Sequence, residues 1–550
     1  QQPDTLLVNR SELGMALDSY VVEVVWLSPQ QVAVKVVPRL QNSFAVYSVN
    51  ATSVQVVPLS TQSHPLYLEP KQAMTVLQGG AEYADVEVVG GFTHLVAYST
   101  STGQRTRQLT SGAWEVLAVV GYSPQLALLF FSAPVIDAPT PASGSIQRAV
   151  YSVDVGSQTP NSTIQQLSCD PSLPPDTLLR WETADFSPDG NYFVLSKLAA
   201  NDHVGPNDGS DKLGSVVCSV SASSSSSWLD PANTTLLQRL TSNDDFRREI
   251  QKFMAPTRVF YDIPAVPDGG GMPMRASVLF PPGASHDCTG LTDSTPYPAL
   301  VHVYGGPGSQ EVHSRTFFGS GGPGFHSYLS SSHDILIVSV DPVGTGGLGD
   351  EYTKDSTYMH LGLTEARDVV GAVQWLKQQC FVDSSRVALW GWSFGGFLSS
   401  FVAAQPDHGL QAVMSVAPVT DWGLYDSVYT ERYMQTPSLN PGGYANTSLL
   451  NKAGVFATNA QEANPNWLLV HGTADDNVHF QNSALLVKAL VAKSQFQFST
   501  FYYPDRAHGL RGEQGQDNPH LYRMLSHHLF RAFGMPICDD DEVTCQADDE

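Results

Sequence analysis

One serine lies among glycines directly after an apolar run, in "ALWGWSFGGFLSS" (388–400). The residues before Ser393 are typical of a buried strand, and those after it begin a helix. A sharp strand-to-helix turn exposes a serine hydroxyl, and Gly391 and Gly395 relieve the crowding that it causes. This context favours a nucleophile over a small residue in a glycine-rich loop. The next backbone N–H, that of Phe394, would then face a developing oxyanion.

A serine hydroxyl is a weak nucleophile at neutral pH, so it needs a base and a group that orients the base. "NWLLVHGTADDNV" ends a predicted strand at Asp475, and "FYYPDRAHGL" ends the next one at His508. The order Ser, Asp, His at the ends of successive strands is that of α/β-hydrolases. We therefore expect Ser393, Asp475 and His508 to act together. Among the other histidines, His471 is expected to be structural, and His527 and His528 are expected to be surface or packing residues of the last helix.

The elements around these residues predict an α/β domain over 255–535. Six apolar runs alternate with helical segments, which indicates a mostly parallel sheet with helices on both faces. The runs are "PALVHVYGG", "DILIVSVD", "RVALWGWS", "AVMSVAPV", "NWLLVHG" and "FSTFYYP". One helix, in "TEARDVVGAVQWLKQQC", has an apolar face made of Val369, Ala372, Val373 and Leu376. Asn518 and Pro519 form a helix-opening pair for the last helix.

Residues 1–245 predict only strands and turns, and they contain a repeat. "AVYSVN", "LVAYST" and "AVYSVD", aligned on Tyr47, Tyr98 and Tyr151, lie 51 and then 53 residues apart. A period near 50 residues fits about four to five blades of a partial β-propeller. A β-sandwich with a recurring tyrosine is the alternative. Residues 536–550 form an acidic tail.

The net charge of −24 argues against nucleic acid or an anionic membrane as a partner. No apolar run reaches the roughly 18 residues of a membrane span. The chain opens on Gln1 and not on methionine, so an upstream leader or membrane anchor stays open. Five glycosylation sequons favour a secreted or lumenal protein, and they lie at Asn9, Asn50, Asn161, Asn233 and Asn446.

The six cysteines are too few for a disulfide scaffold in a chain of this length. In an oxidising compartment Cys169 could pair with Cys218, and Cys538 with Cys545, but the sequence leaves the connectivity open. None has the C-x-x-C spacing of a zinc site. We expect no metal and no organic cofactor.

Four motifs, "GWSFGGF", "HGTADDNVHF", "VYGGPGSQ" and "DSVYTERYM", closely resemble those of the dipeptidyl peptidase IV family. These prolyl-oligopeptidase-like serine peptidases pair an α/β-hydrolase domain with an N-terminal β-propeller. The resemblance implies that Ser393 is the nucleophile, His508 the general base and acid, and Asp475 the carboxylate that holds the imidazole. Asp476 would be structural. Tyr304 matches the family tyrosine whose hydroxyl completes the oxyanion hole with the N–H of Phe394.

The resemblance also implies a substrate pocket for a proline ring. An apolar aromatic box suits a pyrrolidine ring, which has no polar side-chain group to bind. The matching residues are Val419, Trp422, Tyr425, Tyr429 and Val478. Asn477 matches an asparagine that hydrogen-bonds a substrate carbonyl. The implied substrates are peptides with proline or alanine at the second position, and a homodimer is one assembly that the resemblance allows.

The chain departs from the family pattern in several places. It has no Glu-Glu dipeptide, the acidic pair with which dipeptide-releasing members bind the substrate amine. Its propeller portion is shorter than the eight blades of the family, which suggests that the N-terminal blades are absent. Val343 replaces a usual arginine, and Ala412 and Ala532 stand where a disulfide is common.

These observations predict a serine exopeptidase that releases N-terminal dipeptides. The missing glutamate pair keeps a prolyl endopeptidase or acylpeptide hydrolase as the alternative. The partial propeller keeps a non-catalytic binding protein as a third hypothesis.

Overall fold

A computed structural model describes residues 18–136, 146–156, 164–167, 182–197, 214–220, 234–241, 256–266, 273–285, 296–314, 322–458, 466–512 and 518–537. The chain divides into two compact units. The first contains residues 1–247, with 314–316 and 347–351. The second contains residues 248–313, 317–346 and 352–550.

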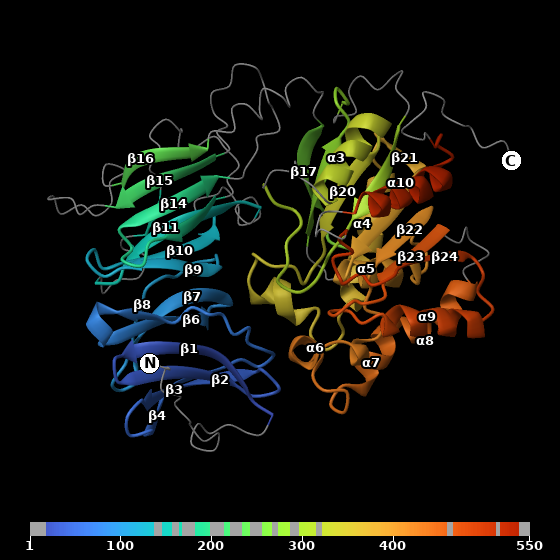
Figure 1. The fold of residues 1–550 in the computed structure, drawn as a ribbon. Helices are drawn as coiled ribbons and strands as arrows, with labels where there is room; N and C mark the ends of the chain where they lie inside the picture. The colour runs from blue at the N-terminus through green and yellow to red at the C-terminus, as the bar shows by residue number, and fades with distance from the viewer. Residues whose placement is uncertain are drawn as a thin grey trace. The chain divides into compact units, whose positions relative to one another are not determined.

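The described residues of the first unit form four antiparallel sheets of four strands each, which follow one another along the chain (Figure 1). The first sheet contains β1 (Tyr20–Ser28), β2 (Gln31–Val37), β3 (Ser43–Asn50) and β4 (Val56–Ser63). The second contains β5 (Thr75–Leu77), β6 (Glu82–Val89), β7 (Phe92–Ser99) and β8 (Arg105–Gln108), with the short helix η1 (Gln78–Gly80) after β5. The third contains β9 (Ala118–Ser123), β10 (Leu128–Pro134), β11 (Arg148–Asp154) and β12 (Gln165–Gln166). The fourth contains β13 (Glu182–Phe186), β14 (Tyr192–Lys197), β15 (Gly214–Val220) and β16 (Thr234–Thr241).

The sequence repeat corresponds to one sheet. Tyr47, Tyr98 and Tyr151 lie in β3, β7 and β11, the third strand of the first, second and third sheets. Buried apolar residues of neighbouring sheets pack together, as Tyr98 does with residues of the first sheet and Tyr151 with residues of the second. The described residues of this half confirm its predicted β character, and "ADFSPDGNYFVLS" forms β13, a turn and β14 as expected.

The second unit is built on one sheet of eight strands in the order β17-β18-β20-β19-β21-β22-β23-β24. All six predicted strands are confirmed: β19 (Tyr297–His302), β20 (Leu336–Asp341), β21 (Val382–Trp392), β22 (Ala412–Val416), β23 (Asn466–Gly472) and β24 (Phe498–Tyr503). They are parallel to one another. Two further strands, β17 (Thr257–Ile263) and β18 (Met274–Phe280), continue the sheet in antiparallel fashion.

Helices cover both faces of this sheet. The described helices are α3 (Gly322–His333), η4 (Glu351–Asp355), α4 (Leu363–Lys377), α5 (Phe394–Ala403), η5 (Trp422–Leu424), α6 (Ser427–Met434), α7 (Pro441–Thr447), α8 (Leu449–Thr458), α9 (Gln481–Ala492) and α10 (Pro519–Phe533). The four residues of the predicted apolar face of α4 are all buried. Asn518 caps α10 by accepting a hydrogen bond from the Leu521 N–H, as its position before Pro519 predicted.

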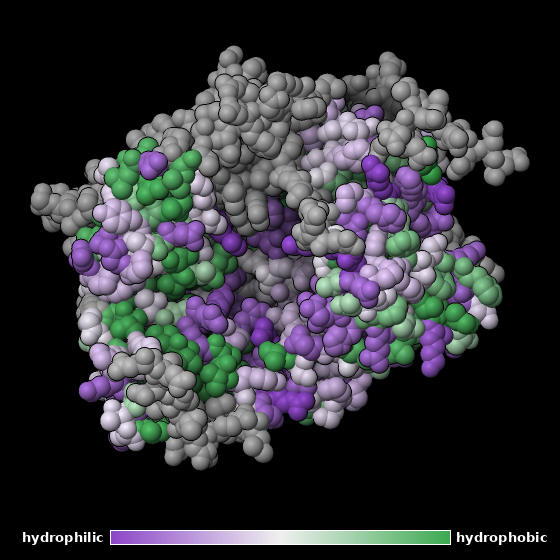
Figure 2. Space-filling model, in the orientation of Figure 1, coloured by the Kyte–Doolittle hydropathy of each residue, from purple (hydrophilic) through white to green (hydrophobic). Residues whose placement is uncertain are grey.

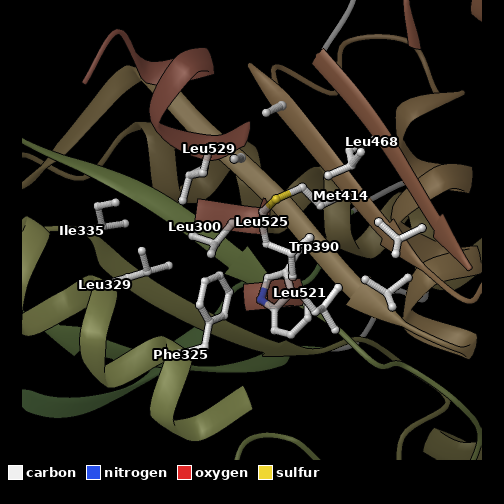
Figure 3. Packing of buried hydrophobic residues seen from close by; sticks show 14 of the residues in the cluster. Leu300, Phe325, Leu329, Ile335, Trp390, Met414, Leu468, Leu521, Leu525 and Leu529 are labelled. Atoms are coloured by element: carbon white, nitrogen blue, oxygen red, sulfur yellow. The ribbon is translucent and has the colours of Figure 1, made fainter. Parts of the chain in front are cut away.

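One face of the sheet forms a large core with α3 and α10 (Figure 3). Trp390 in β21 packs edge-on against Phe325 of α3, with ring centroids 5.5 Å apart. Leu521, Leu525 and Leu529 reach the same core at helical spacing from α10. Successive strand residues point to opposite faces of the sheet, and Trp390 points into this core. The chain then continues to Ser393, directly after the end of β21.

Cys218 and Cys380 are both disulfide-bonded. The other four cysteines lie outside the described residues, as do the sequons at Asn9, Asn161 and Asn233 and the tail from residue 538. Asn446 is exposed on α7, and Asn50 is half-buried at the end of β3.

Hydrophilic and hydrophobic residues are interspersed on the visible faces of both units (Figure 2). No helix within the described ranges has the length and apolarity needed to cross a membrane.

Candidate active site

Ser393 lies between β21 and α5 in a strained backbone conformation, with φ 60° and ψ −117°. Its N–H donates to the Val416 carbonyl of the neighbouring strand at 2.9 Å, which anchors the turn to the sheet. The flanking glycines are required sterically. A Cβ at Gly391 would lie 2.4 Å from the backbone of Gly395, and one at Gly395 would lie 2.2 Å from the Val303 carbonyl oxygen. The structure therefore gives a physical reason for each glycine of G-x-S-x-G.

Asp475 follows β23, and its buried carboxylate is held on both oxygens. Oδ1 accepts hydrogen bonds from the backbone N–H groups of Asn477 at 3.0 Å and Val478 at 2.9 Å. Oδ2 lies 2.8 Å from Nδ1 of His508. Burial alone would raise the pKa of Asp475, but the hydrogen bonds from His471, His508 and the backbone hold that pKa well below its usual range. Asp475 therefore stays an anion beside the imidazole.

His508 lies in the loop after β24, and its side chain is partly exposed. The bond to Asp475 occupies Nδ1 and leaves Nε2 for other partners. The indole Nε1 of Trp392 donates to the backbone carbonyl of His508 at 3.1 Å. Trp392 directly precedes Ser393, so this bond joins the serine turn to the histidine loop. The structure thus brings Asp475 and His508 into contact and places both at the strand edge that carries Ser393.

Tyr304 lies two residues after β19, beside the start of α5. Its ring centroid is 6.0 Å from that of Phe394, the first residue of the helix. Burial, and then the negative charge of Glu311, raise the pKa of the Tyr304 hydroxyl. Tyr304 therefore keeps its proton at neutral pH and can donate a hydrogen bond. The Phe394 N–H lies in the first turn of α5, where backbone donors have no partner within the helix.

The five predicted pocket residues include a continuous aromatic cluster. The rings of Trp422 and Tyr429 are stacked with centroids 6.3 Å apart, and the Tyr425 ring meets that of Tyr429 edge-on at 5.5 Å. Trp422 is also 5.5 Å from Phe394, which links the cluster to the serine turn. Val419, Trp422 and Val478 are buried, whereas the two tyrosines are half-buried. The accessible part of the cluster is therefore the tyrosine edge.

Asn477 is exposed beside Asp475, and Tyr425 orients it. The Tyr425 hydroxyl donates to Asn477 Oδ1 at 2.8 Å. Because that oxygen is occupied, the amide NH₂ of Asn477 remains available as a donor. Burial first, and then nearby Asp426, Tyr304 and Asp475, raise the pKa of Tyr425 to about 12, so its hydroxyl stays protonated.

Sequence reasoning missed two contacts. His471, interpreted only as structural, lies with Nε2 3.2 Å from Asp475 Oδ2. The i, i+4 spacing of His471 and Asp475 across the strand end was the available signal. Trp392 was not singled out, and no local pattern indicates its bond to His508.

Asp476 is exposed, and His528 Nε2 lies 2.8 Å from the Asn466 carbonyl oxygen. Within the described residues, no group of three or more His, Cys, Asp or Glu is arranged to hold a metal.

The second unit is an α/β-hydrolase domain. Its sheet is mostly parallel, a serine turn follows β21, and an Asp–His pair follows β23 and β24. Residues 324–536 match the model of the prolyl oligopeptidase family, and residues 3–202 match that of the dipeptidyl peptidase IV N-terminal region. The chain belongs to the dipeptidyl peptidase IV family of serine peptidases.

Individual relatives agree with this assignment. The chain is 30% identical over 533 residues to a probable dipeptidyl-aminopeptidase B of Emericella nidulans, covering 94% of this chain and 52% of that protein. It is 30% identical over 522 residues to dipeptidyl peptidase 4 of Trichophyton equinum, covering 92% of this chain and 59% of that one. The crystal structure of Porphyromonas gingivalis dipeptidyl peptidase 4 is similar, with a TM-score of 0.78, 28% identity, and coverage of 94% of this chain and 64% of that chain. The chain thus spans between about half and two thirds of the length of these relatives.

Proposed function

We propose that the chain carries the catalytic domain of a serine exopeptidase that releases N-terminal dipeptides from peptides with proline or alanine at the second position. The observation that carries the proposal is the 2.8 Å bond between His508 and Asp475, joined through Trp392 to the strained turn of Ser393. This is the relation that a serine nucleophile needs, because its base must be present and held in one orientation.

The proposed reaction has two steps. Ser393 Oγ attacks the carbonyl carbon of the second residue while His508 Nε2 takes the hydroxyl proton, and Asp475 stabilises the resulting imidazolium. The C–N bond then breaks, His508 returns the proton to the leaving amine, and the dipeptide stays as an ester on Ser393. Water attacks this ester with His508 as base again, which frees the dipeptide and restores the serine.

Two donors would stabilise the oxyanion of each tetrahedral intermediate. The Phe394 N–H supplies one, and the protonated Tyr304 hydroxyl supplies the other. The raised pKa of Tyr304 supports this role, because the phenol stays a donor. No step requires a metal or an organic cofactor.

The aromatic cluster supports the substrate preference. A proline ring binds through contact area and stacking, which the accessible parts of the Tyr425 and Tyr429 rings, packed beside buried Trp422, would offer. Alanine is small enough to enter the same box. The Asn477 amide, oriented by Tyr425, would donate to a substrate carbonyl. We assign the five pocket residues and Asn477 to substrate binding.

The second candidate function differs from the exopeptidase in that it does not bind a free substrate amine. The sequence contains no Glu-Glu pair, and this absence favours a prolyl endopeptidase or acylpeptide hydrolase as a second candidate. Turnover of a Gly-Pro anilide is to be compared with that of its N-blocked counterpart. The exopeptidase requires preference for the free amine, whereas preference for the blocked substrate would establish the alternative.

A fluorophosphonate tests the nucleophile itself and the third hypothesis, a non-catalytic binding protein. We expect one phosphonyl group per chain on Ser393, located by peptide mass spectrometry, and none in Ser393→Ala. A wild-type protein that stays unlabelled would contradict the enzyme assignment.

We further propose that the four sheets are blades of a partial propeller over residues 1–245, and that the hydrolase domain spans 255–535.

The disulfides of Cys218 and Cys380 support a secreted or lumenal protein. The exposed sequon at Asn446 suits glycosylation, and a smaller N-glycosidase mobility shift in Asn446→Gln than in the wild type would test it. Exposed Val491, Phe496 and Phe501 support a homodimer, which light scattering would test.

A further inference from the structure

A second histidine, His471, is completely buried at the end of β23 and makes three close polar contacts. Its Nδ1 lies 2.7 Å from the Ser483 hydroxyl in α9. Its Nε2 lies 2.7 Å from the Val478 carbonyl oxygen and 3.2 Å from Asp475 Oδ2. The ring therefore lies behind the carboxylate and touches the loop that follows it.

These partners fix which ring nitrogen carries the proton. The Val478 carbonyl and the Asp475 carboxylate can only accept, so Nε2 must be the N–H donor. In the neutral ring, Nδ1 then accepts from the Ser483 hydroxyl. One N–H is thus shared between Asp475 and Val478, and the ring cannot rotate without losing all three contacts.

The contacts of His471 complete the donor set of Asp475. Two backbone N–H groups bind Oδ1, and the imidazoles of His508 and His471 both bind Oδ2. The same N–H holds the Val478 carbonyl, and Val478 and its neighbour Asn477 belong to the proposed substrate pocket. His471 is therefore the buried group that contacts the carboxylate and the pocket loop together.

We propose that His471 is a positioning residue that fixes Asp475 and the pocket loop as one unit, so that it supports both the nucleophile and substrate binding. This inference rests on the proposed function. It requires that removing the Nε2 donor slows the serine chemistry and weakens dipeptide binding together, and that a side chain restoring the donor rescues both.

The chain offers a matched control in His94. That ring is also buried, with Nδ1 3.1 Å from the Thr110 hydroxyl and Nε2 3.0 Å from the Gly112 carbonyl oxygen. Its hydrogen-bond pattern equals that of His471 except that no carboxylate takes part. Replacing His94 therefore reports the effect of losing a buried structural histidine of the same kind.

The experiment measures the second-order rate of fluorophosphonate labelling and the KM for a Gly-Pro anilide in the purified protein. His471→Phe fills the space without a donor, and we expect labelling roughly 10- to 100-fold slower together with a several-fold higher KM. His471→Gln places an amide N–H near the position of Nε2, and both values should return to within about 3-fold of wild type. His94→Phe and His94→Gln should leave both values at the wild-type level.

Two results would overturn the proposal: a folded His471→Phe protein that is labelled at the wild-type rate, or a Gln variant as slow as the Phe variant. If His471→Phe does not fold, Ser483→Ala keeps the ring and removes its anchor. We then expect labelling slower by roughly 3-fold with a raised KM, and wild-type values for both would refute the positioning role. A wild-type protein that is not labelled at all contradicts the proposed function instead, so the two failures are distinguishable.

Discussion

The indole N–H of Trp392 donates to the carbonyl oxygen of His508 at 3.1 Å, so the residue before the serine is tied to the backbone of the histidine. The two residues are 116 positions apart in the chain. The bond ties the histidine loop to the end of β21. We propose that it thereby sets the approach of the imidazole to Ser393.

Replacing Trp392 by Phe should therefore lower kcat while the protein stays folded. The lost hydrogen bond is worth roughly 0.5–1.5 kcal/mol, so we expect a fall of about 2- to 10-fold. Trp390→Phe is the matched control, because that indole lies in the same strand and donates to His326 Nε2 within the core. The control should lower the melting temperature and leave kcat unchanged. Equal kcat losses in both variants would show that the effect is not specific to the histidine loop.

Replacing Asp475 by Asn should nearly abolish turnover. An amide cannot accept from all the donors that surround the carboxylate, and it favours the wrong tautomer of His508. We expect kcat to fall by about 10⁴-fold at neutral pH, measured with a Gly-Pro anilide. Asp476→Asn changes the exposed neighbouring carboxylate and should stay close to wild type. A larger loss in the Asp476 variant than in the Asp475 variant would reverse the assignment of the two residues.

Replacing Tyr304 by Phe should remove one of the two oxyanion donors. Because the hydroxyl is needed mainly when charge develops, kcat should fall by about 10²- to 10³-fold with little change in KM. Tyr297→Phe, at the start of the same strand β19, is the control and should keep wild-type kinetics. A Tyr304→Phe effect confined to KM would indicate ground-state binding instead.

The parts of the fold that sequence predicted are those with local signals. Apolar runs identified the six parallel strands, and Asn518 before Pro519 identified the start of α10. Strands β17 and β18 were missed because their place in the sheet depends on pairing between β18 and β20, which no local pattern encodes. The repeated tyrosines gave the spacing of the first three N-terminal sheets because each marks the third strand of its sheet.

In the candidate active site, too, sequence predicted the features with local signals and missed those that depend on distant contacts. The order of Ser393, Asp475 and His508 follows from the strand order, so sequence alone placed them at one edge of the sheet. The contacts of His471 and Trp392 were not predicted, because they depend on how a turn folds back and how a distant loop docks. The resemblance to the family named the pocket residues, but not the bond from Tyr425 that orients Asn477.

Glu365 in α4 provides a prediction about stability and pH. Its side chain is completely buried, Oε2 accepts a hydrogen bond from the Gly362 N–H at 2.9 Å, and Oε1 has no partner within the described residues. Burial raises the pKa of this carboxyl from 4.5 to about 8, with a further contribution from Asp368. Between these values the folded protein keeps the proton that the unfolded chain has lost.

The folded state therefore binds more protons than the unfolded state over this range, and the free energy of unfolding contributed by Glu365 falls as pH rises from 4.5 to about 8. Glu365→Gln cannot ionise, but its amide oxygen can still accept from Gly362. We expect urea unfolding to show similar stabilities near pH 5, and the variant to gain on the order of a few kcal/mol over the wild type by pH 8. A stability difference between variant and wild type that stays constant across this range would mean that Glu365 does not titrate there. The sign of the change distinguishes burial from pairing, because a carboxylate stabilised by a cation would make the variant lose stability as pH rises.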